Sequence, residues 1–351
     1  MNAFTPVAAL ACLGALYGCG KAPSPPAADA VLYNGAVYTM NDALPRASAV
    51  AIRDGAIVYV GDDETARTFM GPDTHRVDLR NRMLLPGFHD THAHVLAGGS
   101  SLTGCNMNDV RDGGRIREML RECLAKFQYG DDEWVIGSRW ALAAFADGNP
   151  RKEWLDEVFG DRPAYFVDSF AHSAWVSSRA LEIAGIDETT PDPPQGVIER
   201  DPENGEATGT LRDAAMELVA SHIPEDDDEA VLAGIQRGLQ EVSKFGITAY
   251  IEPGIDGRYA RLYADMDRRG ILTARVLGSL SSLAWHAGQM QDGLYDLLEQ
   301  RAGWRGQMFR ADSVKVYIDG VIETKTSNML APYSDGTNFP TFYTGDALKT
   351  L

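Results

Sequence analysis

The sequence predicts an α/β fold in which helices connect parallel strands, and three observations support this class. From residue 247 onward, strand-like and helix-like segments alternate, which is typical of a parallel sheet with crossover helices. The stretch 84–94 starts as an apolar run and ends in two histidines, and we expect it to contain a buried strand. The chain of 351 residues is 44% hydrophobic, which is enough to bury a large core.

The parallel part is expected to be a partial barrel. Its strands are expected near residues 84–92, 247–252, 272–280 and 313–319, with helices near 257–269 and 288–301. A complete (β/α)8 barrel of the TIM type takes about 250 residues, so these strands are too few to close one. Residues of about 100–245 are then a large insertion after the first strand. An alternative counts 134–140 as a barrel strand, which still leaves the barrel short.

The segment before the barrel has a different pattern. Between residues 30 and 82, short apolar runs alternate with turn signals such as Asn34-Gly35 and Asp54-Gly55. We expect hairpins here and a small β-module, without βα repeats.

Residues 1–19 are predicted to direct export. The apolar core in residues 1–19 is too short to span a bilayer and is typical of a signal peptide. It ends in Leu16-Tyr17-Gly18-Cys19, which resembles a bacterial lipobox with Cys19 as the lipidated residue; a plain signal peptide is the alternative. Residues 20–29, rich in Pro and Ala, would form a tether. The expected location is the periplasmic or outer-membrane side of a Gram-negative bacterium, with a lipid anchor in the membrane.

Charge and cysteine content restrict the partners. Acidic residues outnumber basic ones by 50 to 32, giving a formal charge of −18, which argues against nucleic acid as a partner. A small-molecule substrate is compatible with this charge, and homo-oligomerisation is left open. Outside the export segment, Cys105 and Cys123 form either a disulfide or two buried free thiols.

The sequence Asp90-Thr91-His92-Ala93-His94 is the main candidate for a functional site. Residues i and i+2 of a strand point to the same face, so His92 and His94 are expected to project together. Two imidazoles placed in this way can bind one divalent metal. The alternative is a pair of ordinary polar residues near a strand end.

A lysine in a later apolar strand is the second candidate. Lys315, Tyr317 and Asp319 alternate with apolar residues along 313–319. A buried lysine is costly unless it is paired or chemically changed. A salt bridge with Glu252 or Asp319 would satisfy it.

Several motifs resemble one protein family. The Pro86-Gly87 turn followed by Asp-x-His-x-His resembles the first barrel strand of the amidohydrolase superfamily. Other segments are similar to the amidohydrolase family 3 branch, which includes N-substituted formamide deformylase; they are residues 172–181, 196–199, 205–209 and 315–320. The resemblance covers about residues 30–351.

This resemblance implies a metal site and further residue roles. The cofactor would be one or two divalent ions, with zinc as the first choice, held by His92 and His94. Lys315 would react with CO2 to give a carbamate that bridges two ions, in place of the salt bridge. Asp90, Asp319 and His172 would act near the substrate or behind the ligands, although His172 is equally explained as a hydrogen-bonded residue of a hairpin. Residues 30–82 would be half of a composite β-sandwich.

The family also uses two histidines and a catalytic aspartate on later barrel strands. No histidine follows Lys315 in the sequence. We therefore expect residues 83–351 to be the first half of the barrel of a longer protein, with the catalytic base beyond Leu351 and no activity in the chain as it stands.

The function implied by the resemblance is hydrolysis by metal-activated water. The bond would be a non-peptide C–N bond in an amide, a formamide or a related small molecule. The alternative, from another class, is a surface-tethered binding protein that has lost its metal ligands and does not catalyse a reaction.

Overall fold

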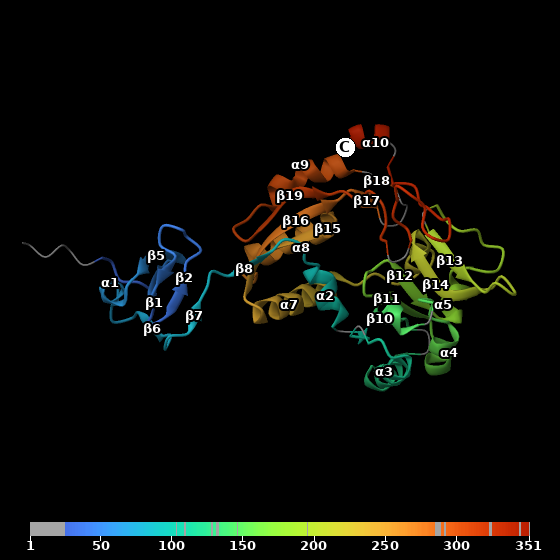
Figure 1. Ribbon diagram of the computed structural model, residues 1–351, viewed down its shortest axis with the longest axis horizontal. Coiled ribbons are helices and arrows are strands. Elements are labelled where there is room, and N and C mark those ends of the chain that lie inside the picture. The colour runs from blue at the N-terminus through green and yellow to red at the C-terminus, as the bar shows by residue number, and fades with distance from the viewer. Residues whose placement is uncertain are drawn as a thin grey trace, which may run out of the picture. The chain divides into compact units, whose positions relative to one another are not determined.

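The computed structural model describes residues 25–350 apart from a few short gaps, which are residues 103, 109, 128, 131, 132, 146, 195, 285–288, 291, 292, 323, 324 and 344. The chain divides into two compact units, Met1–Pro86 and Gly87–Leu351 (Figure 1).

The N-terminal unit contains two small sheets and one short helix. One sheet has the order β5-β4-β1-β6, with β1 (Ala30–Tyr33), β4 (Ala49–Arg53), β5 (Ala56–Gly61) and β6 (His75–Asp78). The other has the order β3-β2-β7, with β2 (Ala36–Tyr38), β3 (Arg46–Ala47) and β7 (Met83–Leu84). Helix α1 (Asp63–Arg67) places Ala66 against a core that includes Val31 and Ala49.

One of the two predicted turns in this unit is confirmed and the other is wrong. Asp54 and Gly55 both have positive φ angles, of 51° and 72°, and join the antiparallel strands β4 and β5. At Asn34-Gly35, in contrast, the chain passes from β1 to β2, which lie in different sheets. Gly35 packs so closely on Leu79 that an added Cβ would lie 2.4 Å from its Cδ1. The glycine here permits close packing and does not form a hairpin.

The second unit is built on a four-stranded parallel sheet with the order β19-β16-β15-β8. Its strands are β8 (Phe88–Asp90), β15 (Ile247–Ile255), β16 (Arg275–Ser281) and β19 (Phe309–Lys315). Helix α8 (Gly257–Arg268) connects β15 to β16, and α9 (Leu294–Trp304) precedes β19. This arrangement confirms the predicted α/β alternation.

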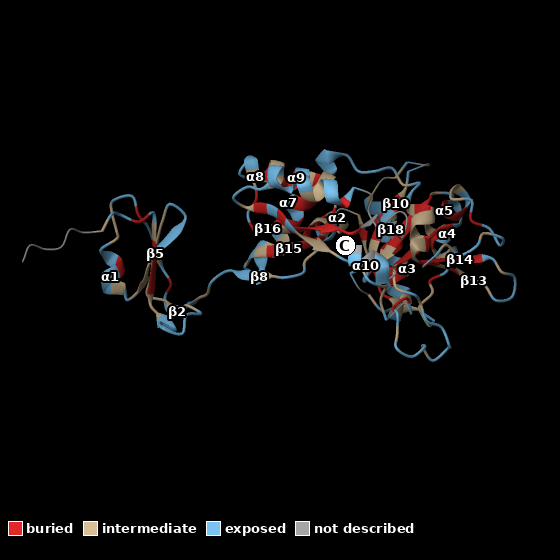
Figure 2. Ribbon diagram, turned by 90° about the horizontal axis from the view of Figure 1, so that it is seen from above, coloured by how far each residue is buried: buried red, intermediate tan, exposed pale blue. Residues whose placement is uncertain are grey.

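Amphipathic helices bury their apolar faces on this sheet. Helix α7 (Asp228–Lys244) starts at Asp227, whose carboxylate accepts the Ala230 N–H, and it buries Val231, Ile235 and Leu239 at helical spacing. These side chains join a core with Tyr263 and other residues of α8, β15, β16 and β19. Figure 2 shows buried residues along β15 and β16, with exposed residues on the outer faces of the helices.

The insertion forms its own mixed six-stranded sheet, with the order β13-β14-β12-β11-β10-β9 (Figure 1). The strands are β9 (Cys105–Asn106), β10 (Val135–Trp140), β11 (Ala164–Asp168), β12 (Ser173–Val176), β13 (Gly196–Arg200) and β14 (Ala207–Asp213). The accompanying helices are α3 (Gly113–Lys126), α4 (Glu153–Phe159), α5 (Ser178–Ile183) and α6 (Glu217–Ala220). Because β10 pairs with β9 and β11, the alternative that made 134–140 a barrel strand is wrong.

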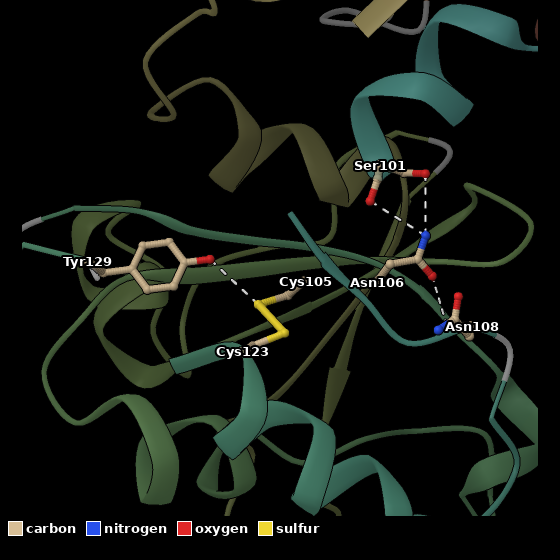
Figure 3. The surroundings of a disulfide bond; sticks show 6 residues. All are labelled: Ser101, Cys105, Asn106, Asn108, Cys123 and Tyr129. Carbon is tan, nitrogen blue, oxygen red and sulfur yellow. Dashed lines mark hydrogen bonds between the residues drawn. A yellow bond between two sulfur atoms is a disulfide. The ribbon is translucent and has the colours of Figure 1, made fainter. Parts of the chain in front are cut away.

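Cys105 and Cys123 form a disulfide, which decides between the two alternatives left open by the sequence (Figure 3). The bond joins β9 to α3 across a Cα–Cα distance of 5.5 Å. The Tyr129 hydroxyl lies 3.5 Å from the Cys105 Sγ. The Asn106 side-chain amide donates to the backbone carbonyl of Ser101, at the end of α2 (Val95–Ser101), at 3.5 Å.

The remaining elements are short. Strands β17 (Leu283–Ala284) and β18 (Gln289–Met290) form a two-stranded ribbon, two 3-10 turns cover Leu142–Ala144 and Ala214–Met216, and α10 comprises Gly345–Thr350. Within the described residues, every helix is too short or too polar to cross a membrane.

Candidate metal centre

The two histidines of the Asp-x-His-x-His motif lie just beyond the carboxyl end of β8. The strand ends at Asp90, so the expectation that His92 and His94 share a strand face is wrong. The Asp90 carboxylate accepts the backbone N–H of His92 at 3.0 Å and turns the chain at that point. The Ala93 N–H still donates to the Ile251 carbonyl at 3.0 Å, which keeps the segment beside β15.

The two imidazoles are nevertheless close together. Their ring centroids are 5.3 Å apart, with the planes nearly perpendicular. A zinc–nitrogen bond is about 2.0–2.1 Å long, so both rings can reach a single ion. Burial of the ring lowers the pKa of His94, and the charges of His92 and Lys315 lower it further. A lower pKa favours the neutral imidazole, which is the form that binds a metal.

Lys315 is the last residue of β19, because pairing with β16 stops at Ser281 and Lys315. The observed strand therefore begins and ends earlier in the sequence than the expected strand over 313–319. Tyr317 and Asp319 come after its end. The Lys315 Nζ lies 5.0 Å from the centroid of the Tyr317 ring. Since β8 and β19 belong to one parallel sheet, Lys315 lies at the same carboxyl edge as the histidines.

The salt bridge proposed as an alternative for Lys315 is not formed with either expected carboxylate in the described part of the chain. The carboxylate of Asp319 accepts the backbone N–H of Asn328 at 2.9 Å. The Glu252 carboxylate accepts hydrogen bonds from backbone N–H groups and from a tyrosine hydroxyl. Among the described residues, Lys315 has no carboxylate partner.

Glu252 is a buried carboxylate of the site that the sequence interpretation considered only as a partner for Lys315. It lies on β15 with 3% of its surface exposed. Its Oε2 atom accepts the backbone N–H groups of Val95 and Leu96 at 2.9 and 3.2 Å, and the Tyr263 hydroxyl at 2.9 Å. Burial raises its pKa to about 7, although these hydrogen bonds act in the opposite direction. An acidic residue within the apolar strand 247–255 is the signal that identifies it.

A cavity lies directly beside these groups. It has a volume of about 300 Å³ and opens to solvent, and its lining includes His94, Ser100, Glu252, Gly254 and Tyr259. The lining thus combines a histidine, a residue type that binds metals, with a buried acid. The volume of the cavity is large enough for a small molecule.

The residues present supply part of a metal site. Within the described residues, no group of three or more His, Cys, Asp or Glu side chains is placed to hold a metal ion. His92 and His94 form a two-nitrogen donor pair, whereas a zinc site needs three or four ligands. Lys315 can add oxygen donors only as a carbamate, because its ammonium group has no lone pair.

His172 lies in the insertion, in the turn between β11 and β12. Its Nδ1 atom is 2.6 Å from Asp213 Oδ1, and its backbone N–H donates to Asp168 at 2.8 Å. It does not line the cavity described above. His172 is therefore a hydrogen-bonded residue of a hairpin, as one of the two alternatives expected. A role toward substrate stays a prediction.

Comparison with known proteins identifies the class. The Amidohydrolase family matches residues 76–351, and the chain belongs to this family. The predicted relationship to its family 3 branch, with N-substituted formamide deformylase among the relatives, is confirmed.

Three relatives illustrate the similarity in sequence. The chain is 30% identical to Protein LONG AFTER FAR-RED 3 of Arabidopsis thaliana, covering 91% of this chain and 55% of that protein. It is 28% identical to Putative amidohydrolase YtcJ of Bacillus subtilis, covering 87% and 57%. It is 27% identical to N-substituted formamide deformylase of Arthrobacter pascens, covering 83% and 54%. The chain therefore spans a little over half the length of these relatives.

The fold is similar to that of a solved protein described as an uncharacterised metal-dependent hydrolase from Pyrococcus horikoshii. The TM-score is 0.64 at 20% sequence identity, over 91% of this chain and 61% of that one. A similarity at this level of identity supports the α/β fold.

Proposed function

We propose that this protein is part of a metal-dependent hydrolase that cleaves a non-peptide C–N bond in an amide, a formamide or a related small molecule. The observation that carries the proposal is the position of His92, His94 and Lys315 at one edge of the parallel sheet, with His94 lining an open cavity. Membership of the amidohydrolase family supports hydrolysis. A formamide deformylase among the relatives supports the C–N bond.

Each residue has a definite task in this proposal. His92 and His94 would hold a divalent ion through nitrogen lone pairs, with zinc as the first choice. Lys315, once its ammonium group has given a proton to water, would attack the carbon of CO2. The N–C bond forms, the electrons of one C=O π bond move to oxygen, and the nitrogen releases a second proton to water. The resulting carbamate would offer two oxygens that share one negative charge. Asp90 holds the backbone of His92. When bound, the metal supplies a Lewis acid that polarises a carbonyl and lowers the pKa of water.

The proposal extends to parts of the architecture. The sheet β19-β16-β15-β8 would be the first half of a (β/α)8 barrel, and the N-terminal unit would be half of a composite β-sandwich. The remaining metal ligands and the proton acceptor would lie on later strands, as the resemblance to the family implies. His172 and Asp319 would act on the substrate side of the site.

The test uses the full product of the reading frame and compares single substitutions. His92→Ala should lower the bound metal and the turnover of a simple N-substituted formamide together, each by at least about tenfold. The matched control is His75→Ala, which removes an imidazole from β6 in the other unit and should change neither quantity. Metal content is measured by elemental analysis of zinc, iron and manganese.

Lys315→Ala distinguishes a site with a Lys315 carbamate as ligand from a one-metal site on His92 and His94. If Lys315 is a carbamate ligand, this variant loses most of its activity, and short carboxylic acids restore part of it by occupying the place of the carbamate. Full metal content and full rate in Lys315→Ala would instead support a one-metal site on His92 and His94. A wild-type protein that binds no metal and hydrolyses no amide would favour the non-catalytic binding protein.

A further inference from the structure

His94 is both a candidate ligand and the N-cap residue directly before helix α2. The first N–H groups of a helix have no partner within the helix, and a side chain at the start usually accepts one of them. Asp227 does this for α7 and Asp256 for α8. The His94 side chain makes no such bond in α2, so the first turn of this helix needs an acceptor from elsewhere.

Glu252, which lies on β15 and 157 positions after Val95, supplies that acceptor. One carboxylate oxygen accepts the N–H groups of Val95 and Leu96, the two residues directly after His94. The Tyr263 hydroxyl donates to the same oxygen, and the Tyr250 hydroxyl lies 3.4 Å from that of Tyr263. Glu252 thus belongs to β15, accepts a hydrogen bond from α8 through Tyr263, and accepts two more from the first turn of α2.

The body of α2 is restrained by a second contact. Its backbone packs directly on α7 at glycines of both helices. A Cβ added to Gly99 would lie 2.0 Å from the Gly234 carbonyl, and one added to Gly238 would lie 2.2 Å from the Val95 carbonyl. This contact leaves no room for the helix to move closer to α7. The bonds to Glu252 add a separate restraint on its first turn.

We propose that Glu252 is the positioning residue for His94. By binding the N–H groups of Val95 and Leu96, it fixes the backbone from which the imidazole enters the cavity that both residues line. The inference rests on the proposed function in that it treats His94 as a metal ligand. A carboxylate is well suited to this position because bonds from N–H groups to an anion at a helix N-terminus are stronger than those to a neutral acceptor.

The test compares two substitutions of Glu252 with a matched loss of a helix cap. Glu252→Ala leaves the Val95 and Leu96 N–H groups without an acceptor, whereas Glu252→Gln keeps the size and one accepting oxygen. Asp227→Ala is the control, because it removes the cap of α7, which carries no proposed ligand. The full protein is titrated with Co²⁺, and the ring signals of ¹⁵N-labelled histidines are recorded by NMR.

We expect Glu252→Ala to weaken Co²⁺ binding by about 10- to 100-fold and to shift the His94 ring signals, with Glu252→Gln in between. Asp227→Ala should bind Co²⁺ within about twofold of wild type even where its melting temperature falls. Wild-type affinity and unchanged ring signals in both Glu252 variants would overturn the proposal. If Glu252→Ala does not fold, Glu252→Gln and its His94 signals decide.

A failure of the proposed function would be seen separately. Wild-type protein that does not bind Co²⁺ would contradict the metal site. The positioning role is then judged on metal-free protein, by hydrogen exchange at the Val95 and Leu96 amides and by the His94 ring signals. Faster exchange with shifted signals in Glu252→Gln supports it, and no change in either overturns it.

Discussion

Glu252 also makes the stability of the protein depend on pH. Burial raises its pKa from 4.5 to about 7 in the folded protein. Between these values the folded state keeps a proton that the unfolded state has released. The free energy of unfolding therefore falls as pH rises through this window, because the carboxylate is charged in a buried position at its upper end.

We predict that wild type loses stability relative to Glu252→Gln as pH rises from 4.5 to 7.5. One pKa unit corresponds to about 1.4 kcal/mol, so the relative loss is on the order of 3 kcal/mol. Urea unfolding of metal-free protein in the presence of a chelator measures this difference at several pH values. Parallel curves for the two proteins would show that Glu252 titrates at its ordinary value when folded.

At the scale of single elements, the disulfide between β9 and α3 determines how the first strand of the insertion is attached. The two cysteines are 18 positions apart and both are buried. Neighbouring Asn106 donates to the Ser101 carbonyl at the end of α2, so β9 connects the insertion to the helix that directly follows His94 (Figure 3). Loosening β9 should therefore affect the insertion first.

We predict that the double variant Cys105→Ala with Cys123→Ala is less stable to unfolding by about 3 kcal/mol, the value typical of a closed loop of this length. Thermal unfolding is followed with and without a reductant. Wild type should lose stability in the reductant, whereas the double variant should not respond. Free thiols mapped to Cys105 and Cys123 by mass spectrometry of the native, unreduced protein would contradict the prediction.

At the scale of the whole molecule, residues 1–19 are expected to decide where the protein is located. Residues 1–24, with Cys19, lie outside the residues that the structure describes. We propose that the protein is exported and lipid-anchored through Cys19. Cys19→Ser should then move the protein from the membrane fraction to the soluble fraction. Cys12→Ser, which changes a cysteine within the apolar core, is the matched control and should leave the protein in the membrane. Equal membrane binding of both variants would rule out the anchor.

Local pattern in the sequence was sufficient for the fold class and for part of the site. Alternating βα segments after residue 247 indicated a parallel sheet, and the structure confirms strands β15, β16 and β19 there. The Asp-x-His-x-His motif indicated the paired imidazoles, although for an incorrect geometric reason, because the strand ends at Asp90. Such features can be predicted because they depend on residues within a few positions of each other.

Tertiary structure alone decided which distant residues meet. The bond from Glu252 to the backbone of Val95 depends on the register of β15 beside β8 and on the seating of α2 against α7. The pairing of Cys105 with Cys123, and the place of 134–140 in the sheet of the insertion, depend likewise on how strands and helices pack. Hydrophobic periodicity shows that a segment has a buried face, but not which partner covers it. For this protein, the sequence by itself determined the elements and the candidate ligands, whereas packing between remote elements determined what surrounds and holds them.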